Sequence, residues 1–302
     1  MRSKGGILAL STIGIAAALL IVIAPGVRSS PHQPSVPETP VVLDSSSVPS
    51  LEFILSSFNV LGSRHTAPGN TRDDMAPGPI RIRWVARLLS RHDVDVVGFQ
   101  ELQLDQLDAF LRVTGETYDV YPGSAKGGRG SNNSIAWRTQ TWQLADAYTI
   151  PVPYFNGKRW PMPVVLLRNR STGLSAYFTN FHNPASTRRH PNQRRWRRAA
   201  LEQEVAMVNR LVRETDDPVF LTGDLNSRKV AFCTLTGRAG MIAANGGSND
   251  GSCQPPDPLD IDWIFGSDGV TFSGYLADQG RLVSKSSDHP MLVTHVRIGG
   301  KP

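Results

Sequence analysis

The chain has 302 residues, of which 40% are hydrophobic and 19% are charged, with a formal net charge of +6. No internal repeat is visible, which excludes a repeat architecture, and two cysteines are too few for a thiolate metal site. The positive charge permits an anionic partner without identifying one.

The N-terminal segment has the pattern of an export signal. Arg2 and Lys4 precede an apolar run over residues 7–23, which is broken by Ala24-Pro25-Gly26. We therefore predict that residues 1–28 are a signal peptide. The run is also close to the length of a membrane span, and residues 26–30 make a poor cleavage site, so an uncleaved anchor through residues 7–23 is the alternative. In both cases we expect the remaining chain to be extracellular, secreted or anchored to the outer face of the plasma membrane.

A linker follows the export segment. Residues 29–50 are rich in Pro and Ser and cannot bury a core, so we place the folded domain at residues 51–302. Cys233 and Cys253 are the only cysteines, and in an exported chain such a pair predicts one disulfide, with two buried free thiols as the alternative. Closing a loop of this length would stabilise the fold by roughly 3 kcal/mol.

Apolar runs bounded by Gly, Pro and Asn predict a series of strands, and a few segments have helical spacing. The predicted strands cover residues 51–61, 94–99, 118–121, 134–137, 142–150, 164–168, 174–179, 219–222, 261–265, 270–276 and 291–298. The predicted helices cover residues 80–92, 104–113 and 194–213, the last with an apolar stripe of Leu201, Val205, Val208 and Val212. Strands dominate, so we predict an α/β fold, a two-layer β-sandwich flanked by helices.

Short polar islands stand at the ends of the apolar runs. Their candidate functional residues are Asn59, Glu101, His182, Asp224, Asn226, Asp262, Asp288 and His289. Strand ends that all carry such side chains predict one polar site at the rim of the sandwich. Oxygen ligands with imidazole and no thiolate suit a hard cation, Mg2+ or Mn2+, and hydrolysis of a phosphate ester. Asp224-Leu225-Asn226 alone also fits a turn, whereas Asp262 inside an apolar strand is costly unless it is paired.

The islands, taken in this order, resemble those of the endonuclease/exonuclease/phosphatase superfamily, which has the deoxyribonuclease I-like four-layer fold. The resemblance runs from residue 51 to about residue 298, and its motifs are Gly-Asp-x-Asn at residues 223–226 and Ser-Asp-His at residues 287–289. It implies that Glu101 and Asn59 bind the metal ion and that Asp288 serves the metal or the phosphate.

The same resemblance implies roles for the remaining islands. Asp224 would orient or deprotonate the attacking water, and Asn226 would contact a phosphate oxygen. His289 would act at the scissile phosphate, oriented by Asp262. His182 matches a histidine that several members carry at that strand end.

A basic run over residues 188–198 leads into the predicted helix 194–213. Arginines at a helix N-terminus add to its positive end, which suits phosphate but costs stability without it. We therefore predict that Arg194, Arg195 and Arg198 bind substrate, with a solvated helix start as the alternative. The sequence predicts a monomeric, exported, metal-dependent phosphodiesterase that acts on nucleic acid. A lipid or inositol phosphate hydrolase of the same fold and a catalytically silent binding domain are the alternatives.

Overall fold

The computed structural model describes residues 49–299. The predicted export segment and nearly all of the predicted linker lie outside these residues and stay predictions. Within residues 49–299 the structure contains no helix that is both long and apolar enough to cross a membrane.

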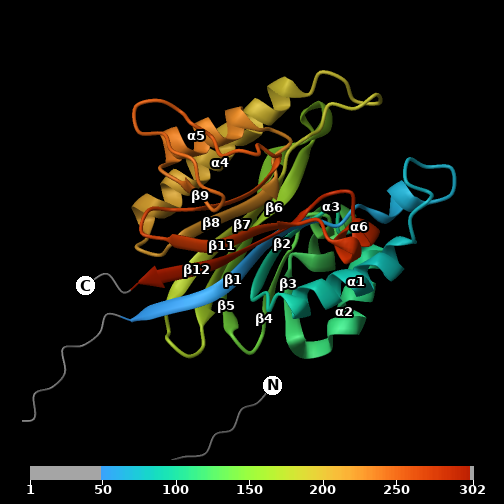
Figure 1. Cartoon of the computed structure of the whole chain (residues 1–302), viewed down its shortest axis with the longest axis horizontal. Helices are drawn as coiled ribbons and strands as arrows, with labels where there is room; N and C mark the ends of the chain where they lie inside the picture. Colours follow the sequence, from blue (N-terminus) through green and yellow to red (C-terminus); the bar gives the residue numbers. More distant parts are fainter. Residues whose placement is uncertain (1–48, 300–302) are drawn as a thin grey trace, which may run out of the picture. The chain divides into compact units, whose positions relative to one another are not determined.

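Two six-stranded mixed sheets form the centre of the domain (Figure 1). The first sheet has the strand order β11-β12-β1-β2-β4-β3, and its strands are β11 (Thr271–Asp278), β12 (Met291–Gly299), β1 (Ser50–Asn59), β2 (Val96–Gln100), β4 (Ile135–Arg138) and β3 (Tyr118–Tyr121). The second has the order β5-β6-β7-β8-β10-β9, and its strands are β5 (Trp142–Pro153), β6 (Arg159–Asn169), β7 (Ser175–His182), β8 (Val219–Asp224), β10 (Asp262–Gly266) and β9 (Ile242–Ala243). The predicted α/β sandwich is confirmed.

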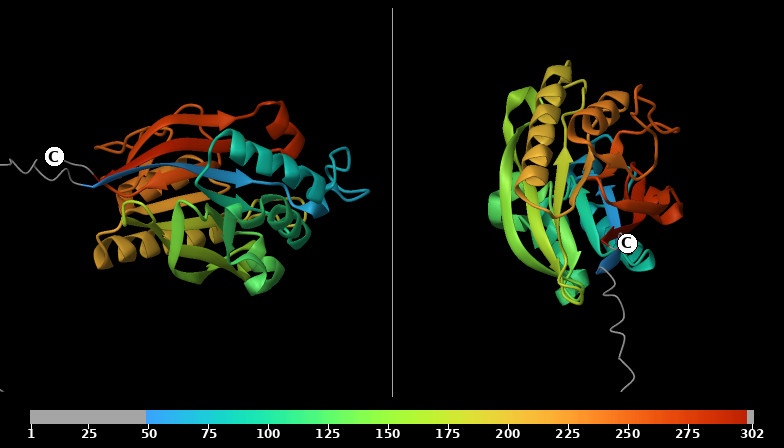
Figure 2. Two further views of the ribbon diagram at one scale, coloured as in Figure 1. Left: turned by 90° about the horizontal axis from the view of Figure 1, so that it is seen from below. Right: turned by 90° about the vertical axis from the view of Figure 1, so that its left-hand side faces the viewer.

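Helices cover the outer faces of both sheets, which gives four layers (Figure 2). Helices α1 (Gly78–Arg91), α2 (Leu104–Thr114) and α6 (Arg281–Ser286) pack on the first sheet, and α4 (Arg194–Glu214) and α5 (Lys229–Ala239) pack on the second. The short α3 (Gly127–Ser131) precedes β4. Helices α3, α5 and α6 were not predicted, because they are short or carry no clear apolar stripe.

Helix α4 begins and ends close to the predicted bounds, but its apolar stripe differs from the prediction in one residue. Leu201, Val205 and Val208 are buried against the second sheet, whereas Val212 is 47% exposed. Leu211 takes the buried position in the last turn of the helix. The fourth residue of the predicted stripe was therefore wrong.

Aromatic rings fill the space between the two sheets. Phe53 lies edge-on to Trp142, Phe178 and Phe220, with ring centroids 5.2 to 5.7 Å apart. Such arrangements are favourable because the positive ring edge meets the negative ring face. These side chains come from both sheets, so the packing fixes one sheet against the other.

A buried polar network joins the sheets directly beneath their carboxyl ends. Gln100 Nε2 and Thr222 Oγ1 both donate to Asn180 Oδ1, over 2.6 and 3.1 Å, and Asn180 Nδ2 donates to the carbonyl of Phe99 over 2.7 Å. Gly98 makes this close approach possible, since a Cβ there would lie 2.0 Å from Thr222 Oγ1. The network sets the relative position of the strand ends that carry the candidate site.

Cys233 in α5 and Cys253 form a disulfide that closes a separation of 20 residues. The predicted pairing is confirmed. Disulfides persist in oxidising compartments, so the bond is consistent with a location outside the cytoplasm.

Candidate active site

Four strands bring polar side chains to one edge of the sandwich. Asn59 ends β1, Glu101 follows β2, His182 ends β7 and Asp224 ends β8. Because β1 and β2 pair in parallel, as do β7 and β8, their carboxyl ends meet at the same edge. Asp262 opens the antiparallel β10 directly opposite Asp224. The topology thus gathers residues that are up to 203 positions apart, from Asn59 to Asp262.

Asp224 is the hub of this site and is almost fully buried. Its Oδ1 accepts the backbone N–H of Asn226 over 2.9 Å, and its Oδ2 accepts Asn59 Nδ2 over 3.2 Å. The same Oδ2 lies 3.5 Å from His182 Nε2 and 3.9 Å from His289 Nε2. Three separate segments, those of Asn59, His182 and His289, therefore converge on one carboxylate.

His289 and Asp262 form a close pair beside this hub. His289 Nδ1 lies 2.8 Å from Asp262 Oδ2, which leaves Nε2 directed to Asp224. Burial and the neighbouring Asp224 raise the pKa of Asp262. Burial lowers the pKa of His289, but the hydrogen bond and charge of Asp262, together with Asp224, outweigh it and raise that pKa. The imidazole is therefore held in its protonated form at neutral pH.

Ser287 fixes the position of the His289 loop. Its Oγ donates to the carbonyl of Asn59 over 2.6 Å and accepts the N–H of His289 over 3.1 Å. The serine of the Ser-Asp-His motif thus ties the loop to the end of β1. Sequence reasoning gave this serine no role.

Glu101 occupies a strained backbone position at the end of β2, with φ at +61°. Left-handed backbone at a residue with a Cβ costs on the order of 1–3 kcal/mol and persists only when its surroundings enforce it. Glu101 Oε2 accepts the N–H of Gly62 over 2.8 Å and lies 3.3 Å from His65 Nε2, and Oε1 lies 3.4 Å from Asn59 Nδ2. Burial alone would raise the pKa of Glu101, but His65, His182 and Gly62 hold it well below its usual range.

The turn that presents Asn59 to the site is held by a buried arginine. Arg81 of α1 is fully buried and donates to the carbonyls of Val60, Leu61 and Ser286 over 2.6 to 2.7 Å. Burial lowers its pKa to about 10, so it remains a cation at neutral pH. Because Leu61 N donates to Asn59 Oδ1 over 3.0 Å, this arginine also orients the asparagine side chain.

Two sets of residues meet the requirements of a metal site. Among the described residues, Asp224, Asp262 and His289 offer ligand atoms within 4.8 Å of one another. Glu101 is the second possibility, because its carboxylate is anionic and its side chain is 22% exposed. Asn59 directs its amide nitrogen to this carboxylate and its oxygen to the N–H of Leu61. Carboxylate and amide oxygens are the donors that hard divalent cations prefer, so Glu101 fits such an ion, and Asn59 would join it through the second lone pair of its oxygen.

Asp288 is directed away from these groups. Its Oδ2 accepts both Nε and Nη2 of Arg72, over 3.2 and 2.9 Å. Arg72 belongs to the loop after β1, so this pair closes that loop over the Ser-Asp-His segment. Asp288 can serve a cation only if it leaves this arginine.

The predicted arginines lie at the start of α4 and are exposed. The guanidinium of Arg195 lies 4.4 Å from the ring centroid of Trp196. Arg194 and Arg198 are directed to solvent, and Arg197, which was not predicted, donates to the carbonyl of Pro184 over 2.8 Å. This last bond attaches the helix start to the segment that follows His182.

Tyr154 and His65 contact the site but were not predicted. Tyr154 is buried, and its hydroxyl lies 3.4 Å from His182 Nδ1. His65 lies beside Glu101, and the hydrogen bond with that carboxylate raises the pKa of His65. Tyr154 is in the β5–β6 turn and His65 is in a single 3-10 turn over Ser63–Thr66, where no periodic pattern marks them, so only their aromatic or titratable side chains could have indicated a role.

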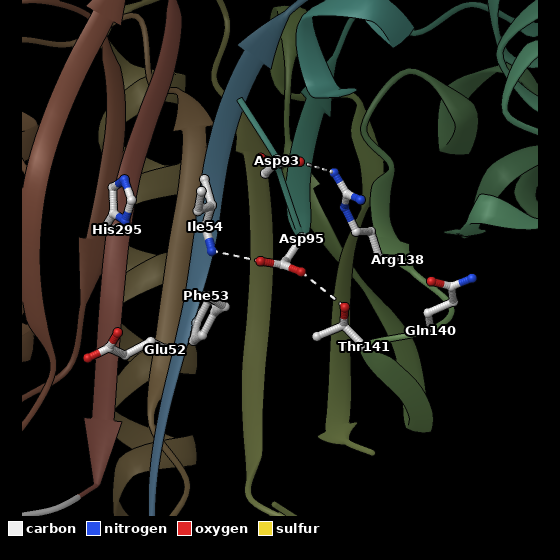
Figure 3. A pocket seen from close by; sticks show the side chains of 9 residues that line it. All are labelled: Glu52, Phe53, Ile54, Asp93, Asp95, Arg138, Gln140, Thr141 and His295. Atoms are coloured by element: carbon white, nitrogen blue, oxygen red, sulfur yellow. Dashed lines mark hydrogen bonds and ion pairs between the residues drawn. The ribbon is translucent and has the colours of Figure 1, made fainter. Parts of the chain in front are cut away.

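A polar depression lies at the other end of β1, away from Asn59 (Figure 3). Here β1 extends beyond its pairing with β2, which begins at Leu55 and Val96. The side chain of Asp95 fills the place of the missing strand: it accepts the N–H of Ile54 over 2.9 Å and the hydroxyl of Thr141 over 3.1 Å. Both oxygens of the Asp95 carboxylate are therefore used by neighbouring residues of the fold. We assign this depression a structural role and no ligand.

The two-sheet sandwich with carboxylate, amide and imidazole groups at its strand ends is the architecture expected of a phosphoesterase. Sequence comparison agrees: the chain belongs to the Endonuclease/Exonuclease/phosphatase family, whose model matches residues 56–289. It is thus a hydrolase of that family with a candidate metal site. No curated protein matches the chain in sequence.

Solved structures share the fold at low sequence identity. The human Nocturnin catalytic domain with bound sulfate matches with a TM-score of 0.64 and 15% identity, over 82% of this chain and 96% of that one. The mannosyl-6-phosphatase Bt3783 of Bacteroides thetaiotaomicron matches with a TM-score of 0.60 and 18% identity, over 81% and 99%. ANGEL2, a 2′,3′-cyclic phosphatase in complex with adenosine-2′,3′-vanadate, matches with a TM-score of 0.58 and 16% identity, over 82% and 96%.

Proposed function

We propose that the protein is an exported, divalent-metal-dependent phosphodiesterase of nuclease type. The observation that carries this proposal is the convergence of the His289–Asp262 pair and the Asp224 carboxylate, with 3.9 Å between His289 Nε2 and Asp224 Oδ2. A protonated imidazole and a carboxylate facing the same space can neutralise a phosphate oxygen and activate a water, the two requirements of phosphodiester hydrolysis.

His289 is the group proposed to contact the phosphate. Asp262 holds Nδ1, so the remaining N–H, on Nε2, is free to donate to a non-bridging oxygen, on which charge accumulates in the transition state. The ordered buried pair costs no reorganisation when the charge develops. Asp262 acts through His289 and is therefore proposed as a positioning residue.

Asp224 is the group proposed to take the proton of the attacking water. Its two oxygens are oriented by Asn59 and by the backbone of Asn226, so the carboxylate is fixed before substrate arrives. Asn226 has a φ of +48° and uses one amide N–H on the carbonyl of Asn183, over 2.9 Å. Its second N–H is available for a phosphate oxygen. His182 is proposed to stabilise the Asp224 anion from the other side.

Glu101 and Asn59 would hold the cation, Mg2+ or Mn2+, with Asp288 as a further ligand if it leaves Arg72. Asn59 Oδ1 already accepts the N–H of Leu61, but a carbonyl oxygen has two lone pairs and can accept a second partner. When bound, the cation would supply charge neutralisation on the phosphate.

The choice of nucleic acid as substrate depends on charge near the site. Residues 183–198 contain six arginines and no acidic residue, and Arg64 and Arg72 lie in the connection between β1 and α1 that also carries His65. Such clusters favour a polyanion over a single small phosphate. The named activities of the structural neighbours differ from one another, so the shared fold does not decide the substrate. A lipid or inositol phosphate substrate is the second candidate.

The location of the protein is part of the proposal. The disulfide supports an oxidising compartment, and the charged and apolar N-terminal pattern supports export, with release or anchoring through residues 7–23 left to experiment. We propose a monomer that acts on extracellular nucleic acid.

The first prediction tests substrate and metal together. Full-length protein in mild detergent should hydrolyse DNA or RNA with Mg2+ or Mn2+, and EDTA should abolish that activity. Glu101→Gln should raise the metal concentration needed for half-maximal rate, because the variant loses an anionic ligand.

The matched control is Glu116→Gln, an exposed carboxylate outside the site, which should leave the metal dependence unchanged. Hydrolysis of sphingomyelin or inositol phosphates with no cleavage of nucleic acid would replace the nuclease proposal by its alternative. An unchanged metal dependence in Glu101→Gln would remove Glu101 from the metal site.

A further inference from the structure

The tip of the β5–β6 hairpin is joined to the start of α4. We call the two segments, residues 154–158 and 188–196, the rim. Buried Gln193 holds them together, since its Oε1 accepts the N–H of Asn156 over 2.9 Å and its Nε2 donates to Asn156 Oδ1 over 3.0 Å. Gly157 packs so closely on Trp196 that a Cβ there would lie 2.6 Å from the indole. The rim is therefore a rigid surface rather than two independent loops.

Planar side chains are gathered on this rim. The rings of Phe155 and His190 are stacked, with centroids 4.5 Å apart and an angle of 23° between the planes. Asn156 Nδ2 lies 3.3 Å from His190 Nδ1, which fixes the imidazole in the stack. Phe155, His190 and Trp196 are all partly exposed. A planar surface is thus preformed and reachable from solvent.

The rim begins at the candidate active site. The ring centroid of Tyr154 lies 5.3 Å from that of His182, and Phe155 follows with its centroid 4.5 Å from Tyr154. Two ring-to-ring steps therefore separate the stacked pair from a histidine that contacts Asp224. In Figure 1 the hairpin between β5 and β6 and the start of α4 lie on the same side of the molecule.

Cations surround these rings. Lys158, Arg188, Arg189, Arg194 and Arg195 are exposed on the rim, which contains no acidic residue. Aromatic platforms combined with a cationic track are how proteins hold single-stranded nucleic acid, because the bases stack on the rings while the phosphates contact the cations.

We propose that Phe155, His190 and Trp196 form a stacking subsite for an unpaired nucleobase that flanks the scissile phosphate. The subsite rests on the proposed nuclease function and defines its substrate as single-stranded or locally unpaired nucleic acid. Duplex DNA would not reach the rings without opening a base pair.

The same rings do not form a membrane-inserting surface. The large hydrophobic side chains of residues 49–299 that are strongly exposed include none from the rim. Its exposed residues are instead polar or charged, such as Asn156 and Lys158. A lipid surface is therefore the less favoured partner and becomes an outcome of the test.

The experiment uses dinucleoside phosphates, which contain a single scissile bond. Three substrates are compared: one with both bases, one without the 5′ base and one without the 3′ base. The full-length parent and Phe155→Leu are assayed for kcat/KM on each. The variant should lose roughly tenfold to a hundredfold on the substrates that carry the stacked base and nothing on the one that lacks it, since stacking contributes in that range per base.

Two controls keep the result interpretable. Phe272→Leu removes a partly buried ring on β11, outside the rim, and should match the parent on all three substrates. Trp196→Leu repeats the test at a second ring in case Phe155→Leu lowers the folded fraction, which thermal unfolding would reveal.

The outcomes separate the two levels of the proposal. If the parent cleaves dinucleotides but each rim variant loses the same factor on every substrate, or loses nothing, the stacking subsite is wrong and the nuclease function stands. If the parent cleaves DNA or RNA but no dinucleotide, one base on each side is not enough for binding, the stacking subsite is wrong and the nuclease function stands. If the parent cleaves neither a dinucleotide nor DNA or RNA, the nuclease function fails and the subsite with it. If the parent binds vesicles of phosphatidylcholine and phosphatidylserine and Phe155→Leu abolishes that binding, the rim is a lipid surface.

Discussion

Two His–Asp pairs of nearly equal length occupy different regions of the molecule. In the candidate active site, His289 Nδ1 lies 2.8 Å from Asp262 Oδ2, and at the outer edge of the first sheet His92 Nε2 lies 2.9 Å from Asp278 Oδ2. The two histidines are similarly exposed, at 19% and 18% of their side chains. The pairs differ in what surrounds them.

The surface pair is complete in itself. Asp278 uses its other oxygen on the N–H of Gly280 over 2.7 Å, and His92 caps the end of α1. In the site pair, Oδ1 of Asp262 has no hydrogen-bond partner among residues 49–299, and the second nitrogen of His289 is directed to Asp224. A His–Asp pair therefore does not indicate function by itself. It indicates function when one of its polar atoms has no partner or is directed toward a third group.

The largest effect is expected when the site pair is broken. His289→Ala and Asp262→Ala should each lower kcat by roughly two to four orders of magnitude, the usual range for a positioned proton donor. The double variant should lose little more than either single variant, because the two residues act as a unit. Steady-state kinetics on the best substrate of the panel measures all three losses, and additive losses would show that Asp262 does not act through His289.

Glu204 is a second buried acid, and unlike Asp262 it has no histidine partner. Glu204 of α4 is completely buried, and neither of its oxygens has a hydrogen-bond partner within the described part of the chain. Burial raises the pKa of Glu204 to about 8, opposed by the neighbouring amide of Asn183. That amide is near enough to act on the charge but is not placed for a well-formed hydrogen bond.

This acid predicts a pH-dependent stability. The pKa of Glu204 in the folded state lies above its unfolded value, so the folded state binds this proton more tightly than the unfolded state. The resulting stabilisation of the fold is fully present below the unfolded pKa of 4.5. Stability should fall as pH rises from 4.5 to about 8, by on the order of 5 kcal/mol, and then level off. Glu204→Gln should match the parent at pH 4.5 and exceed it at pH 9 in denaturant unfolding.

Glu202→Gln is the control for this experiment, because it changes an exposed acid of the same helix that pairs with Arg238. The control should keep the parental pH profile. If Glu204→Gln also keeps it, Glu204 is solvated in the folded state and the prediction is wrong.

The sequence predicted the architecture and most of the candidate site because both leave local patterns. Asp262 interrupts an apolar strand, and Asp224 ends one, so each is costly unless it has a partner. The burial of Glu204 could have been predicted from its spacing, since it lies three residues after Leu201 and four before Val208, on the buried face of α4. The positions of Tyr154 and His65 could not be predicted, because the tertiary fold brings a hairpin turn and a short 3-10 turn to the site.

Strand β6 shows why element bounds were harder to predict. The predicted strand began at residue 164, after two prolines, whereas β6 begins at Arg159. Pairing with β7 starts only at Val164, so residues 159–163 have a neighbour on one side alone, that of β5. Proline is tolerated where one edge is free, and this edge depends on tertiary pairing that local sequence does not encode.

The smallest effect is expected at the surface pair. His92→Ala and Asp278→Ala should each leave kcat/KM within twofold of the parent, because their hydrogen bonds join the end of α1 to the end of β11 and to Gly280 and reach no group of the site. A double-mutant cycle on unfolding free energy should give a coupling of about 0.2–1 kcal/mol, the range for pairs that water can reach. Both variants should fold, since the pair is partly exposed and no large cavity is made.

A loss of activity above tenfold in either variant, with unfolding free energy unchanged, would connect this edge of the first sheet to catalysis. The hydrogen-bond partners of a His–Asp pair would then no longer distinguish a structural histidine from a functional one in this protein.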